Sequence, residues 1–159
     1  MTLAARVELR KDVIPAEGTG PIKNGRLMPY LDCCGKYWRD CTCEKRGYLT
    51  IGHGRNLDAN GLTKLEAEVL LDHDLAQAEM ECRNAFDWFD ALADARQRVI
   101  VEMVFNLGLT KFREFHNTIA AIQAKDYKRA SSQMLASKWA AQVKGRALRM
   151  ARMMRDGAA

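Results

Sequence analysis

Three side chains near the start of the chain have the types and the order that hydrolysis of a sugar polymer requires. Glu17 comes first, Asp32 follows a segment rich in glycine and proline, and Thr50 lies within the run Gly47–Gly54. Cleavage of a glycosidic bond needs one carboxylic acid to protonate the leaving oxygen and a second carboxylate to handle water. The two glycines that close the run let a polymer approach the backbone near the threonine. These residues indicate a glycosidase.

Glu17 is the candidate general acid. Val13, Ile14 and Pro15 precede it, and apolar surroundings favour the protonated form that a proton donor needs. An isolated Glu-Gly pair is ordinarily interpreted as a surface glutamate beside a turn. Thr50 alone would likewise be interpreted as an ordinary β-branched residue of a strand. The catalytic assignments therefore depend on motifs elsewhere in the chain.

The elements that position these side chains can be predicted from periodicity and turn residues. A helix over about 3–14 should end at Pro15, since proline disfavours helical conformation for the residue before it. Residues 18–29 are rich in glycine and proline and predict a loop. Strands over 27–32 and 48–51 should then pair in a small β lobe over about 18–61.

The rest of the chain is predicted to be helical. Thr63 and Glu66 form a capping box that starts a linking helix over about 63–82. The most apolar helical stripe ends at Gly108, a C-terminal cap, and predicts the central core helix. Further amphipathic runs complete a helical lobe over about 86–156, and they lie at 115–124, 127–136, 138–143 and 146–155.

Motifs from both halves of the chain are similar to those of one known family. They are, in chain order, Glu17-Gly18, Tyr30-Leu31-Asp32, Thr50–Gly54, Arg96–Gly108, Phe115–Thr118, Ser137-Lys138-Trp139 and Gly145-Arg146-Ala147. In order and nearly in spacing, this set resembles the phage lysozymes of the T-even type, the endolysin muramidases of glycoside hydrolase family 24. Each motif alone is weak, but the ordered set from Glu17 to about Gly157 is specific.

The resemblance implies one α+β lysozyme domain over 1–159, with a small β lobe and a larger helical lobe joined by a long helix and the active site in the cleft between them. It implies hydrolysis of the β-1,4 bond between N-acetylmuramic acid and N-acetylglucosamine in bacterial peptidoglycan, for host-cell lysis. It also implies an inverting mechanism, in which Thr50 and Asp32 hold the attacking water, and no cofactor for catalysis.

The second carboxylate has two candidates. Asp32 follows Tyr30 as the family's aspartate follows its tyrosine, whereas Glu44 keeps the family's spacing to the downstream glycine motif. The inserted segment Cys33–Arg46 causes this conflict. We prefer Asp32, because an insertion at a hairpin tip leaves both strands intact, whereas a catalytic Glu44 would place the inserted residues inside the first strand.

The resemblance also assigns residues that support or line the cleft. Where the family has a histidine after its Gly-x-Gly motif, this chain has Arg55, and we expect its fork-shaped guanidinium to pair with Asp74. Arg146 matches the family's arginine near the catalytic glutamate. The positions that line the saccharide cleft are Asn56, Phe105, Thr118 and Gln133. For Phe105 and the nearby Trp139, which lie on apolar helical stripes, a core position is the more ordinary interpretation.

Four cysteines are concentrated in the inserted segment, at Cys33, Cys34, Cys41 and Cys43. Four thiolates can hold a structural zinc ion tetrahedrally, but the spacing differs from the usual Cys-x-x-Cys pairs. Disulfides formed after release and free reduced thiols are equally open alternatives. The three histidines show no common ligand spacing, and we interpret each as structural or exposed.

The formal net charge is +5, and the excess of lysine and arginine lies late in the chain. It indicates a polyanionic partner, but it fits nucleic acid, an anionic membrane and the bacterial envelope equally. Residues 1–12 lack the continuous apolar run of a signal peptide or membrane span. We therefore expect the protein to be made in the host cytoplasm and released to the periplasmic wall by a separate holin-like protein. We also expect it to be a monomer.

The sequence thus predicts an endolysin muramidase that does not bind nucleic acid. One alternative is a basic nucleic-acid-binding module whose cysteine loop is a zinc knuckle, but it gives no role to Glu17, Asp32 and Thr50. Another is a lysozyme fold that binds the wall without cutting it, which the changed residue Arg55 keeps open.

Overall fold

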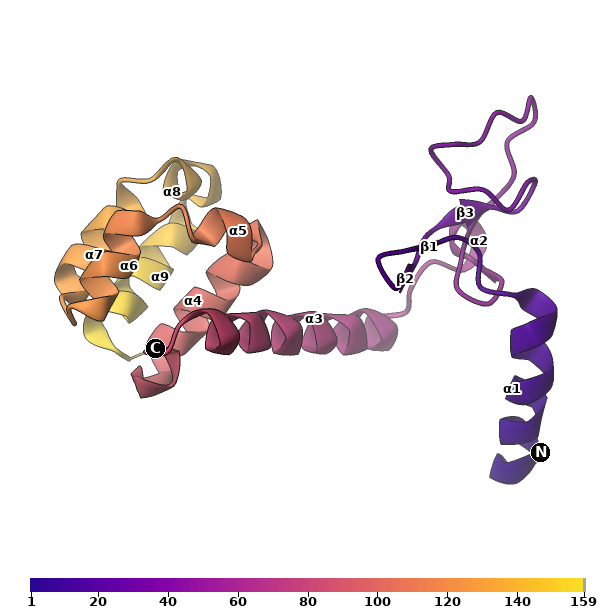
Figure 1. Cartoon of the computed structure of the whole chain (residues 1–159), viewed down its shortest axis with the longest axis horizontal. Coiled ribbons are helices and arrows are strands. Elements are labelled where there is room, and N and C mark those ends of the chain that lie inside the picture. Colours follow the sequence, from indigo (N-terminus) through magenta and orange to yellow (C-terminus); the bar gives the residue numbers. More distant parts are fainter. Residues whose placement is uncertain (159) are drawn as a thin grey trace. The chain divides into compact units, whose positions relative to one another are not determined.

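The computed structural model describes residues 1–158 of the chain (Figure 1). The chain divides into two compact units, Met1–Ala67 and Glu68–Ala159, and the boundary falls inside a long helix. Small antiparallel sheets lie in the first unit, and the second unit is helical. The α+β class predicted from the sequence is confirmed.

Helix α1 covers Leu3–Glu17 and is followed by Gly18. The predicted end at Pro15 is wrong, because the proline lies inside the last turn of the helix. It removes one helical hydrogen bond, but the turn still closes when the Gly18 N–H donates to the Ile14 carbonyl at 3.1 Å. Glu17 is therefore the last residue of the helix, consistent with its expected place at a helix end.

The β region of the first unit contains a hairpin and a separate sheet. Strand β1, Ile22–Lys23, pairs with β2, Arg26–Leu27, within the segment that was predicted to be a loop. Asn24 and Gly25 join the two strands with φ angles of 51° and 72°. This pair of positive φ angles is typical of the tight type I′ turn, which Asn-Gly favours.

The sheet has the strand order β3–β4–β5, with β3 at Tyr30–Leu31, β4 at Leu49–Ile51 and β5 at Arg55–Asn56. A short helix, α2, follows at Leu57–Asn60. The predicted strand over 27–32 is thus divided between β2 and β3, because Pro29 lies in the break and cannot donate a ladder hydrogen bond. The predicted pairing of this region with residues 48–51 is confirmed for β3 and β4.

Helix α3 covers Lys64–Ala85, and the predicted capping box forms at its start. The Glu66 N–H donates to Thr63 Oγ1 at 3.2 Å, and Glu66 Oε2 accepts from the Thr63 N–H at 2.8 Å. The hydrogen bond from the Thr63 backbone is the main reason that the pKa of Glu66 is lowered from its ordinary value. The sequence therefore located the start of this helix correctly.

In the second unit, α4, Asp94–Leu107, is the predicted core helix in that it buries Val99, Ile100, Met103 and Val104, and it ends at Gly108 with φ 79°. It packs against α5 and α9, whereas the most extensive packing joins α7 to α9 and α6 to α7, so it is not the centre of the unit. The other elements are η1 (Phe89–Ala91), α5 (Leu109–Phe112), α6 (His116–Gln123), α7 (Tyr127–Leu135), α8 (Lys138–Val143) and α9 (Gly145–Asp156). Five methionines are buried in the core, at Met103, Met134, Met150, Met153 and Met154. Within residues 1–158, no helix combines the length and apolarity that crossing a lipid bilayer requires.

Candidate active site

Glu17 lies against the turn that follows β4. A Cβ atom built on Gly54 would lie 2.7 Å from Glu17 Oε2, so only a glycine lets the carboxylate approach this closely. The next contact along the turn joins His53 Nδ1 to the Gly18 carbonyl oxygen at 2.8 Å. The hydrogen bond joins the end of α1 to the turn, and the candidate acid lies beside Gly54.

The apolar residues before Glu17 do not enclose it. The Glu17 side chain is exposed in the first unit, and the exposed fraction of Val13 is 40%. The surroundings that favour a protonated acid are therefore not supplied by Val13, Ile14 and Pro15, contrary to the expectation from sequence.

Asp32 is held at the end of β3 by the backbone of Tyr48. Its Oδ1 atom accepts from the Tyr48 N–H at 2.8 Å, and its own N–H donates to the Tyr48 carbonyl at 3.2 Å. A Cβ atom on Gly47 would overlap Asp32 Oδ1 and would lie 2.6 Å from the Cys33 nitrogen. The glycine is required here because the two chain segments touch, and this contact orients the carboxylate.

Thr50 stands at the centre of the sheet. It lies opposite Tyr30 of β3 on one side and opposite Asn56 of β5 on the other, so these side chains share one face. Its hydroxyl donates to the Tyr48 carbonyl at 3.3 Å, and the residue is 4% exposed. Asp32 and Thr50 are thus both bound to one residue, Tyr48.

Asn56, one of the predicted saccharide-binding residues, begins helix α2. Its Oδ1 atom accepts from the Ala59 N–H at 2.9 Å, which is the standard capping interaction. Asn56 therefore lies next to Thr50 in the sheet and stabilises the start of α2. Its contact with a sugar stays a prediction.

Arg55 binds a different carboxylate from the one predicted. Its Nη1 and Nη2 atoms donate to Oε1 and Oε2 of Glu66 at 2.7 and 2.9 Å, and its Nε and Nη2 atoms donate to the Gly61 carbonyl. The capping box fixes the Glu66 carboxylate beside Thr63, two residues after Gly61, whose carbonyl also accepts from Arg55. The predicted partner, Asp74, is exposed on α3, and its Oδ1 atom lies 3.7 Å from His73 Nδ1.

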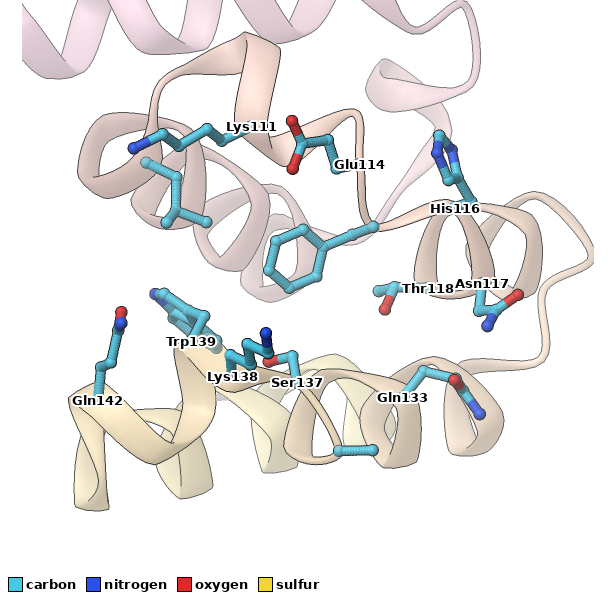
Figure 2. A pocket seen from close by; sticks show the side chains of 13 residues that line it. Lys111, Glu114, His116, Asn117, Thr118, Gln133, Ser137, Lys138, Trp139 and Gln142 are labelled. Atoms are coloured by element: carbon cyan, nitrogen blue, oxygen red, sulfur yellow. The ribbon is translucent and has the colours of Figure 1, made fainter.

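Two of the predicted saccharide-binding residues, Thr118 and Gln133, line one pocket of the helical unit, with a volume of about 660 Å³. Figure 2 shows their side chains near those of Asn117 and Ser137. Amides and hydroxyls are the groups that bind sugar hydroxyls. Trp139 also reaches this pocket, but it is 4% exposed, and its Nε1 donates to Asn106 Oδ1 at 3.1 Å. It is mainly a core residue, as its helical stripe suggested.

Phe105 and Arg146 line a second pocket of the same unit, of about 710 Å³. Phe105 is 43% exposed, so the alternative that placed it in the core is wrong. Arg146 binds Glu102, with Nε 2.7 Å from Oε1, and Arg149 binds both oxygens of the same carboxylate at 2.8 and 2.9 Å. Sequence reasoning missed Glu102, although Arg146 and Arg149 are spaced to share one helix face.

The inserted segment brings its four cysteines together. Their sulfur atoms, from Cys33, Cys34, Cys41 and Cys43, all lie within 4.8 Å of one another. The hydrogen bond from the Cys43 N–H is the main reason that the pKa of the Cys41 thiol falls to about 7. Neighbouring thiols, with Cys33 first, raise the pKa of Cys43 to about 12. The cluster is a candidate metal site, and Cys82, a buried residue of α3, is not one of its members.

The fold and these sites together define a class of protein. Carboxylates lie around one strand of a small sheet, and the pockets of the helical unit are lined by amides, hydroxyls and an aromatic ring. These features are typical of a lysozyme-like glycoside hydrolase. Comparison with known protein families identifies the family within this class, because the family model described as "Phage lysozyme" matches residues 31–155. The chain belongs to the phage lysozyme family. It is accordingly a glycoside hydrolase of the endolysin kind, and its substrate is peptidoglycan.

Proposed function

We propose that the protein is a muramidase of the T-even type, in glycoside hydrolase family 24, that cuts the β-1,4 bond between N-acetylmuramic acid and N-acetylglucosamine during host-cell lysis. One observation carries the proposal. The three candidate catalytic residues meet around β4, since Thr50 lies on it, Asp32 is bound to Tyr48 just before it, and Glu17 lies against Gly54 just after it. Glu17 lies outside the matched residues, so its role rests on this contact.

In the proposed reaction, Glu17 gives its proton to the glycosidic oxygen as the bond to the sugar C1 breaks. Asp32 takes a proton from a water molecule, whose oxygen attacks C1 from the opposite face, so the product has inverted configuration. The Thr50 hydroxyl is proposed to accept a hydrogen bond from this water while it donates to Tyr48. Acid and base are both supplied by the chain, so the proposal includes no cofactor for the reaction.

The remaining parts of the proposal concern the substrate and its delivery. Asn56, Phe105, Thr118 and Gln133 are proposed to contact the saccharide, and Arg55, Asp74 and Arg146 to support the site. The net charge of +5 favours approach to an anionic wall. We propose one lysozyme domain that acts as a monomer, made in the host cytoplasm and released to the periplasm by a separate holin-like protein.

Clearing of outer-membrane-permeabilised Gram-negative cells tests the function. We expect the purified protein to lower the turbidity of such cells and to release fragments with N-acetylmuramic acid at the reducing end. The first product should be the α-anomer, because the proposed mechanism inverts the configuration at C1. Absence of new reducing ends together with salt-sensitive binding to nucleic acid would instead support the binding module. Wall binding without cleavage would support an inactive lysozyme fold.

The contact between Gly54 and Glu17 gives a second test. We expect Gly54→Ala to lower the lysis rate on the order of 10²-fold, because the new Cβ would displace the carboxylate from its position. Gly52→Ala is the matched control, since Gly52 also has a positive φ, of 61°, but a Cβ atom added there would have no neighbour within 4 Å. Equal losses in the two folded variants would show that backbone strain, and not the position of Glu17, determines the rate.

A further inference from the structure

The inserted segment 33–46 has no part in the proposed reaction, and it cannot order itself by burial. None of its residues is buried, and its one piece of regular pairing is the bridge between Tyr30 and Tyr37. A loop of this size without a core needs another source of stability, such as a disulfide or a bound metal. The four thiols are its only cluster of strong ligands.

The backbone places the four sulfur atoms by two different local geometries. Adjacent side chains of an extended strand point to opposite faces, but Cys33 and Cys34 lie in a turn at the end of β3. In this turn the N–H groups of Cys34 and Gly35 both donate to the Leu31 carbonyl, at 3.3 and 2.8 Å. The turn therefore lets two consecutive cysteines approach one point.

The second pair of cysteines, Cys41 and Cys43, does not lie in such a turn. Cys41 and Cys43 are separated by one residue in a stretch without regular secondary structure. The Cys43 N–H donates to Cys41 Sγ at 3.5 Å. Such a backbone bond stabilises a thiolate, the form of cysteine that binds metals.

The distances fit a tetrahedral metal site. With zinc–sulfur bonds of about 2.3 Å, the sulfur atoms of a tetrahedral site are separated by about 3.8 Å. The Sγ atoms of Cys33 and Cys41 are 3.7 Å apart, and all four sulfur atoms lie within 4.8 Å of one another. Two disulfides would instead require each sulfur to have one partner at about 2.05 Å. The observed cluster of four has no such pairing.

The charge of the segment also matches a metal centre. Zn²⁺ with four thiolates carries a formal charge of −2, because each thiol loses a proton on binding. The other side chains of residues 33–46 carry a formal charge of +2, from Lys36, Arg39, Lys45 and Arg46 against Asp40 and Glu44. The insertion therefore brings the cations that would neutralise the centre.

We propose that Cys33, Cys34, Cys41 and Cys43 bind one Zn²⁺ ion in a closed, structural four-thiolate site. The ion has no open position for water, so it takes no part in hydrolysis. Its effect is to fix both ends of the insertion, next to Asp32 on one side and to Gly47 on the other. The inference is independent of the proposed function, because it concerns metal content and stability.

Metal analysis of the protein purified in reductant, without chelator or a metal-binding tag, tests the proposal. We expect about one zinc per chain, a lower melting temperature after chelation, and recovery of both after zinc is restored. Replacement of zinc by Co²⁺ should give the absorption bands of tetrahedral thiolate ligation. Cys41→Ser should lose most of the zinc, whereas Cys82→Ala, which removes the cysteine outside the cluster, should retain it.

Several outcomes would overturn the inference, and none of them depends on folding of a variant. Wild-type protein that takes up neither zinc nor cobalt and has four loop thiols open to alkylation has free cysteines. A mass lowered by two hydrogens for each cross-link shows disulfides. Stoichiometric iron in place of zinc would contradict the assignment of the ion.

Discussion

Replacement of Glu17 by glutamine should abolish wall lysis while the protein stays folded and binds the wall. The amide has nearly the shape of the acid, but it cannot protonate the leaving oxygen, and loss of a general acid typically costs about 10²–10⁴-fold in rate. The turbidity assay on permeabilised cells measures this loss, and cosedimentation with isolated walls measures binding. The melting temperature should stay close to that of the wild type, because Glu17 is exposed at the end of α1.

Glu8→Gln is the matched control for this variant. Glu8 lies on the same helix, is exposed and pairs with Lys11 at 2.8 Å, so its loss changes the same charge at a site away from the turn. We expect its lysis rate to stay within a few-fold of the wild type. Clear lysis by folded Glu17→Gln protein would reject Glu17 as the acid.

The second large effect distinguishes the two candidate carboxylates. Asp32→Asn should lower turnover by orders of magnitude, since the general base is lost. Its amide oxygen can still accept from the Tyr48 N–H, so the local structure should survive. Glu44→Gln should stay within a few-fold, because Glu44 is an exposed residue of the inserted segment.

Initial rates of wall hydrolysis, with zinc content measured in parallel, decide between these variants. The zinc measurement is needed because Cys33 follows Asp32 and Cys43 precedes Glu44 in the chain. If Glu44→Gln were the inactive variant while its zinc content was unchanged, the insertion would have to lie before the catalytic strand position. Glu44 would then replace Asp32 in the proposed mechanism.

The helical part of this fold was predictable because its signals are local. The Thr63–Glu66 capping box and the cap at Gly108 each act within one turn of helix, and both were found where the sequence placed them. The region before β3 was harder. Pro15 predicts the end of a helix but lies in its last turn, and the glycine- and proline-rich segment 18–29 predicts a loop where Asn24-Gly25 joins the two strands of a hairpin. Local signals were present, but each permitted two structures.

Only part of the candidate site could be predicted from the sequence, for a different reason. The pairing of Tyr30 with Thr50 follows from two strands that must share a sheet, so the neighbourhood of Thr50 was accessible from sequence. The partner of Arg55 was not, because a family position pointed to Asp74 while the nearby cap supplied Glu66. Spacing also gave no reliable prediction for the cysteines, since a turn, and not an extended strand, sets where Cys33 and Cys34 lie.

The methionine-rich core of the helical unit has a consequence for the durability of the protein. A thioether side chain is unbranched and adapts to irregular gaps, so such a core should tolerate sequence drift better than one built from branched residues. The same side chains are open to oxidation once they leave the core, and methionine sulfoxide is polar. Met134, Met150 and Met154 are fully buried in the native state. Peroxide should therefore reach these core methionines mainly while the protein is unfolded, and protein that has been heated in its presence should fail to refold.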